Sequence, residues 1–88
     1  MKIKDGFMLR TVADQTIVVP VGSTAASFNG MISLNETGTF LWNRLCDEND
    51  RESLVKALLG EYDVTEEVAA VGVDMFLQKL REAKLIDE

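Results

Sequence analysis

The sequence contains one cysteine, one proline and no histidine, and aromatic residues make up only 7% of its 88 positions. The single cysteine, Cys46, cannot form an intramolecular disulfide, and without histidine the chain has no imidazole for a zinc site or for acid–base catalysis. Asp47 and Glu48 follow it at the predicted end of a helix, where the local field disfavours the thiolate. We therefore expect Cys46 to be a small structural side chain, buried or half-buried, and not a nucleophile.

Long apolar runs are also missing. No segment approaches the roughly 18 consecutive apolar residues of a membrane-spanning helix, and residues 1–6 are not followed by the apolar core of a signal peptide. With 47% apolar and 27% charged residues, the composition is globular, and 88 residues fit a single domain, 1–88. We expect a soluble, cytoplasmic protein that contacts no membrane and is too small to enclose a deep active site.

Basic residues are few and unevenly placed. Residues 1–34 carry three basic and two acidic side chains, whereas residues 35–88 carry six basic and thirteen acidic ones, which gives the chain a net charge of −6. Affinity for nucleic acid rests on lysine and arginine side chains that displace phosphate counterions, and the sequence contains no basic stripe. We therefore expect no nucleic-acid partner.

The acidic residues of the second half do not form a recognisable metal site. Their order lacks the glycine and the closing glutamate of an EF-hand loop. They fall in predicted connections and in the first turns of helices, where they cap helices or face solvent. Carboxylates in such places lack the burial that separates the pKa values of an acid–base pair. We expect a protein that binds no metal, needs no cofactor and is not an enzyme.

The first third of the chain has the composition of β-strands. Residues 7–13 alternate loosely and residues 15–21 form a β-branched run, so the two segments predict a hairpin. Pro20 lacks an N–H group and so belongs at an edge or at the end of its strand. A third strand is expected around Met31–Leu34, and Asn29–Gly30 before it fit either a turn or a bulge.

Three helices are predicted after the strands, each with a capping residue. Asn35 caps a helix over residues 36–46, Asp50 caps a second helix that ends near Gly60, and Thr65 caps a third and longest one. Apolar residues at helical spacing give each helix a predicted buried face. These faces are Leu34, Gly38, Leu41, Trp42 and Leu45 for the first helix, Leu54, Val55, Leu58 and Leu59 for the second, and Val68, Gly72, Met75, Phe76, Leu80 and Ala83 for the third, with Leu85 and Ile86 packing back after it.

Three strands followed by three helices predict a small α+β domain of order βββααα, in which helices cover one face of an antiparallel sheet. Such a sheet has two edges, and the helices cannot cover both, so one strand keeps unpaired N–H and C=O groups. The third helix also carries many apolar residues, namely Val68, Val71, Val73, Met75, Phe76, Leu77 and Leu80. Their arc is wider than one contact needs, which indicates either a second apolar surface or a core contact on both sides.

Two other functions fit parts of this pattern. The second and third helices, with the hairpin as a wing, resemble the winged helix-turn-helix of DNA-binding regulators. A recognition helix needs residues that reach base edges, but residues 65–74 carry Glu66, Glu67 and Asp74 and no basic residue. A small regulatory subunit that binds one protein through the third helix is the other alternative.

Several segments match one known family. The run Gly30–Gly38, with the sequence GMISLNETG, together with Phe40–Trp42, Leu54–Leu58, Glu61–Val64 and Phe76–Ile86, resembles the pyrroloquinoline quinone biosynthesis protein D (PqqD) family over about residues 7–88. The LNETG part is the most specific piece. The resemblance implies a winged helix-turn-helix-like fold and a RiPP recognition element, which is a module that binds the leader of a ribosomally synthesised precursor peptide.

By this resemblance the leader adds as a strand to the third strand and lies in a groove against the third helix. The peptide-binding residues implied are Gly30, Met31, Ile32, Ser33 and Leu34 on the strand and Val68, Val71, Gly72, Met75 and Gln78 on the helix. The implied partners are the precursor peptide and a radical S-adenosylmethionine enzyme or another peptide-modifying enzyme. An unpaired strand edge also pairs with its own copy, so both a monomer and an edge-mediated homodimer fit the sequence.

Overall fold

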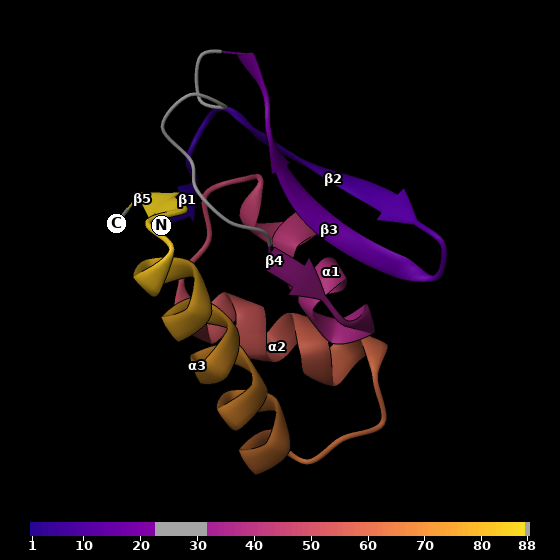
Figure 1. Ribbon diagram of the computed structural model, residues 1–88. Coiled ribbons are helices and arrows are strands. Elements are labelled where there is room, and N and C mark those ends of the chain that lie inside the picture. Colours follow the sequence, from indigo (N-terminus) through magenta and orange to yellow (C-terminus); the bar gives the residue numbers. More distant parts are fainter. Residues whose placement is uncertain (23–31, 88) are drawn as a thin grey trace.

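A computed structural model of the protein describes residues 1–22 and 32–87 (Figure 1). Within these residues the order of elements is β1 (Lys2–Ile3), β2 (Phe7–Val12), β3 (Gln15–Pro20), β4 (Ile32–Leu34), α1 (Glu36–Leu45), α2 (Arg51–Glu61), α3 (Glu66–Glu82) and β5 (Ile86–Asp87). β2, β3 and β4 form one antiparallel sheet in that order, and the helices follow it. The predicted α+β architecture, three antiparallel strands and then three helices, is therefore confirmed.

Each helix begins after the capping residue that the sequence predicts. The Asn35 side chain accepts a hydrogen bond from the N–H of Gly38 at 2.7 Å. Asp50 and Thr65 accept equivalent bonds from the third residues of α2 and α3, at 2.7 and 3.2 Å. The first turn of a helix leaves these N–H groups without a backbone partner, so the capping side chains fix where each helix starts.

The core lies between the helices and the inner face of the β2–β4 sheet. The predicted buried face of α1 is confirmed, and Trp42 is its largest member. Tyr62, which follows α2, packs edge-on against Phe40 of α1 with 5.6 Å between ring centroids. The largest fully buried side chains come from β3, the three helices and the residue before β5; they are Val18, Leu41, Leu45, Leu54, Val73, Leu77, Leu80 and Leu85.

The predicted buried faces of α2 and α3 are wrong in part. Leu59 of α2 is exposed. On α3 the exposed residues include Val68, Gly72 and Met75, which the sequence places in the core, whereas Ala69, Val73 and Leu77 are buried. Both rows recur at three- and four-residue spacing and lie one residue apart, so periodicity alone does not decide which row faces the core. The exposed row is the second apolar surface that the width of the arc indicates.

A second sheet of two short strands joins the ends of the described chain. β1 pairs antiparallel with β5, with Ile3 opposite Ile86, and the N–H of Lys4 donates to the C=O of Leu85 at 2.8 Å. Leu85 and Ile86 are buried, as expected. The sequence does not predict the strands themselves, because two residues are too few to show alternation.

Candidate functional site

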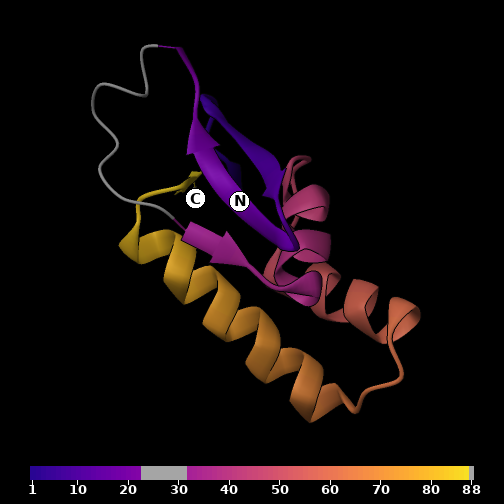
Figure 2. The ribbon, with the colours of Figure 1, turned by 45° about the vertical axis from the view of Figure 1, so that its right-hand side comes forward.

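An open groove of about 800 Å³ lies between β4 and α3. Figure 2 shows β4 running alongside the C-terminal half of α3. The residues that line the groove come from the β2–β3 turn and the first residue of β3, from β4 and the first turns of α1, and from α3. Volumes of this size are typical of ligand sites, and one wall of the groove is formed by β4, a strand to which an extended chain can add.

The register of the sheet decides which part of β4 faces the groove. The N–H of Val21, just beyond β3, donates to the C=O of Gly6 at 2.8 Å, so the odd-numbered residues of β3 direct their backbone groups toward β2. The backbone N–H and C=O groups of Thr16 and Val18 therefore point toward β4, where they pair with those of Leu34 and Ile32. The backbone N–H and C=O of the residue between those two, Ser33, consequently face away from β3, at the open edge of the sheet.

The same register explains the position of Pro20. It is the last residue of β3 and belongs to the set that faces away from β2, so its missing N–H leaves no gap in the β2–β3 ladder. This confirms the placement of Pro20 predicted from the sequence.

A lysine of α3 covers the open edge of β4. Lys79 Nζ donates a hydrogen bond to the backbone C=O of Ser33 at 3.1 Å, across 46 positions of sequence. This bond independently supports the outward direction of the Ser33 carbonyl. The edge carbonyl of the free protein is thus occupied by an ammonium group.

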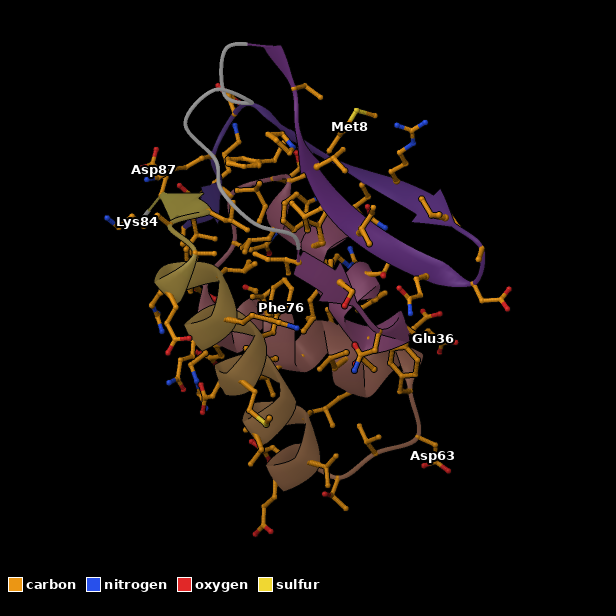
Figure 3. All side chains as sticks on the ribbon, viewed as in Figure 1. Met8, Glu36, Asp63, Phe76, Lys84 and Asp87 are labelled. Atoms are coloured by element: carbon orange, nitrogen blue, oxygen red, sulfur yellow. The ribbon has the colours of Figure 1, made fainter. Side chains whose placement is uncertain are left out.

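The remaining wall of the groove combines apolar and small residues of α3. Phe76 is only 6% exposed and forms an apolar floor, and Figure 3 places it on the side of α3 that faces β4. Met75, 67% exposed, stands at the rim. Gly72 lies one turn before Phe76 and leaves the wall open, and Gln78 at the polar end donates through Nε2 to Glu82 Oε1 at 3.3 Å.

The LNETG run, which carries much of the family resemblance, forms the end of the groove. Asn35 caps α1 there, and Gly38 lies in close contact with that cap. A Cβ added at Gly38 would lie 3.0 Å from Asn35 Oδ1 and 3.4 Å from Leu34 Cβ. Glycine therefore lets β4 turn into α1 without displacing the capping side chain.

The groove brings together half of the predicted site residues. Ser33, Leu34, Gly72, Met75 and Gln78 line it. Ile32 does not: it is half-buried and packs against the core. Val68 and Val71 are 58% and 57% exposed on α3 and are also absent from the lining. Gly30 and Met31 lie outside the described residues, and so does the choice between a turn and a bulge at Asn29–Gly30.

Sequence reasoning missed Lys79 and Phe76 as site residues. Both follow Gly72 and Met75 at the three- and four-residue spacing of one helix face, which is the signal that points to them. Each residue also has a simpler structural role in the sequence. A lysine near the C-terminus of α3 is favoured by the helix dipole, and Phe76 fits the core face of the helix, so neither was singled out as a site residue.

The thiol of Cys46 differs from its expected placement. Cys46 is exposed, because α1 ends at Leu45 and the cysteine is the C-cap beyond the buried stripe. Partial burial and then the negative charge of Asp47 raise the pKa of the thiol, which agrees with the expected direction of the local field. The described residues contain no group of three or more histidine, cysteine, aspartate or glutamate side chains able to hold a metal ion. No helix among them is long and apolar enough to cross a membrane.

Comparison with solved structures finds the same fold in peptide complexes. One is "TbiB1 in complex with the TbiA(beta) leader peptide", with 22% sequence identity, a TM-score of 0.74, and coverage of 99% of this chain and 95% of that chain. Another is "Lasso peptide synthetase B1 complexed with the leader peptide", with 17% identity, a TM-score of 0.70, and coverage of 92% and 89%. A search of curated proteins finds no match.

The family comparison covers most of the chain. The family described as coenzyme PQQ synthesis protein D (PqqD) matches residues 15–86. This range contains β3, β4, all three helices described above and the first residue of β5, and with them both walls of the groove. The chain therefore belongs to the PqqD family.

Proposed function

We propose that the protein is a non-catalytic adaptor that captures the leader of a ribosomally synthesised precursor peptide and presents it to a peptide-modifying enzyme, of the radical S-adenosylmethionine type or another. The observation that carries this proposal is the open edge of β4 at Ser33, directly beside the groove of α3. An extended peptide that pairs with the edge places alternate side chains in the groove, which is how strand addition combines affinity with specificity.

The energies indicate that the groove, more than the edge, supplies the affinity. Ser33 is the described β4 residue that faces outward, and its two backbone groups give two hydrogen bonds of about 1 kcal/mol each. A micromolar Kd requires about 8 kcal/mol, and ordering each peptide residue costs about 1–2 kcal/mol. Burying a large apolar side chain contributes about 1.5–3 kcal/mol, so several apolar anchors against the α3 wall must supply most of the binding free energy. The edge then fixes direction and register.

Family membership and the two structural relatives support this proposal. Both relatives were solved with a leader peptide bound, and this chain shares their fold. The electrostatics favour a peptide over nucleic acid, because the exposed first turn of α3 carries Glu66 and Glu67 and the chain has a net charge of −6.

Proline substitutions at the two edges of the sheet test the proposal. Ser33→Pro removes an N–H group that faces the open edge while leaving the pairing of β4 with β3 intact, whereas proline at Ile32 would break that pairing. Thr11→Pro is the matched control, because Thr11 faces outward at the opposite edge, on β2.

The ligand for this test is selected from a random decapeptide library displayed on phage, and the enriched peptides are then measured by calorimetry. We expect wild type and Thr11→Pro to bind equally and Ser33→Pro to bind at least tenfold more weakly, which corresponds to about 1.4 kcal/mol. Equal binding by Ser33→Pro would show that the peptide does not pair with β4. Failure to enrich any peptide would contradict peptide capture altogether.

A further inference from the structure

We propose that Lys79 determines the specificity of the groove: it covers the edge carbonyl in the free protein and selects peptides that carry one acidic side chain opposite it. This inference rests on the proposed function, since it concerns the same strand edge. Its basis is the 3.1 Å hydrogen bond from Lys79 Nζ to the C=O of Ser33.

The ammonium group lies where a pairing peptide has to place its own backbone. The Ser33 carbonyl is the outward acceptor of the described β4, and an added strand would bring a peptide N–H to it. Lys79 therefore has to leave this carbonyl when a peptide pairs. In the free protein the same contact occupies the edge acceptor from α3, which opposes pairing of β4 with a second copy of the chain.

Displacement of Lys79 affects neutral and acidic peptides differently. A neutral peptide replaces a charge-assisted hydrogen bond with an ordinary one and offers the released ammonium group no carboxylate. An acidic peptide replaces the same bond and offers the released ammonium group a carboxylate at the rim of the groove. The groove thus selects peptides that supply a carboxylate to the released Lys79 ammonium group.

The other charges of the groove limit the acidic side chain to one position. Of the described residues that line the groove, Lys79 alone is cationic, and the remaining charged residues are Asp14 at the β2–β3 turn and Glu82 one turn further along α3. These two carboxylates repel an acidic side chain placed to either side. A single acidic residue at a fixed offset from the apolar anchors is therefore the expected pattern.

The experiment compares selections from the random decapeptide library by wild type, Lys79→Met, Lys79→Arg and Lys56→Met. Methionine keeps an apolar side chain of similar length and removes the charge. Lys56→Met changes the net charge equally but lies on α2, where Lys56 Nζ is 3.4 Å from Glu52 and outside the groove. We expect wild type, Lys79→Arg and Lys56→Met to enrich one aspartate or glutamate position, and Lys79→Met to lose it.

Calorimetry on an enriched peptide gives the second readout. Replacing its acidic residue by the amide should weaken binding to wild type about fivefold, the scale of an exposed ion pair, and should leave binding to Lys79→Met unchanged within twofold. The same loss in both proteins, or enrichment of peptides without an acidic position by wild type, would overturn the role of Lys79 while leaving peptide capture in place. Enrichment of no peptide by any of the four proteins would overturn both proposals.

Discussion

Gly72 occupies a position in α3 where glycine is unfavourable for the free protein. It lies in the middle of a helix of 17 residues, it is exposed, and a Cβ added there would meet no atom within 4 Å. Alanine is favoured over glycine inside a helix by about 1 kcal/mol, and nothing in the fold opposes the exchange. Gly72 also lines the groove, so we expect a peptide backbone to approach α3 there.

Gly72→Ala should therefore raise stability and lower affinity together. We expect the free energy of unfolding to increase by about 1 kcal/mol, which raises the Tm by roughly 4–8 °C in a domain of this size. The added methyl group narrows the groove, and the misfit of one methyl group at a packed contact, on the order of 1–3 kcal/mol, should weaken peptide binding at least about fivefold.

Gly60→Ala is the matched control. Gly60 is exposed in α2, an added Cβ there meets nothing within 4 Å, and it does not line the groove. Urea unfolding should show stabilisation by both variants, smaller for Gly60→Ala because this residue lies near the helix end, and calorimetry with the selected peptides should show weaker binding only for Gly72→Ala. Undiminished affinity of Gly72→Ala would refute close approach of the peptide to this turn of α3.

Three further predictions concern the cap of α1, an ion pair and the thiol. Asn35→Ala should lower the free energy of unfolding by about 1 kcal/mol in urea titrations, and Asn35→Asp, which keeps an acceptor, should lower it much less. Arg51 donates to Asp74 at 2.5 and 2.9 Å, and these hydrogen bonds hold the pKa of Asp74 below its ordinary value. The pair therefore stabilises the fold above the ordinary pKa of aspartate, about 4, and loses this effect as the pH falls through the lower pKa of the folded state. The melting temperatures of wild type and Asp74→Asn should differ at neutral pH and converge in acid once Asp74 is protonated in the folded protein, and a difference that persists there would contradict the pairing. Partial burial and the charge of Asp47 raise the pKa of the Cys46 thiol. Iodoacetamide should therefore react more slowly with Cys46 than with the thiol of glutathione at neutral pH, and a faster reaction would contradict this assignment.

The features predicted well from the sequence are those with a local cause. Asn35, Asp50 and Thr65 each accept a bond from a residue three positions away, and their side-chain chemistry is visible in the sequence. The β2–β3 hairpin is also local, and only its ends differ from the prediction by one residue. The pairing of β1 with β5 joins segments more than eighty positions apart, and neither segment has a pattern of its own.

The site was predicted less completely because it depends on tertiary register. Which of Ile32, Ser33 and Leu34 faces outward follows from the pairing with β3, and a shift of one residue would reverse the answer. Periodicity does not separate the two apolar rows of α3, which lie one position apart. Val68 and Val71, which the family resemblance implies as binding residues, are exposed but do not line the groove. The contact of Lys79 with Ser33 crosses 46 positions and leaves no trace in the local pattern.

The antiparallel pairing of β1 with β5 brings the entry and the exit of the chain to one place on the molecule (Figure 1). A unit with adjoining ends can be spliced into a surface loop of a larger host through short connectors, and it tolerates circular permutation. Within the described residues neither strand contributes to the groove, so such a splice would leave the groove intact. The β1–β5 pairing therefore makes the domain suitable for insertion into another protein without a change to the groove walls.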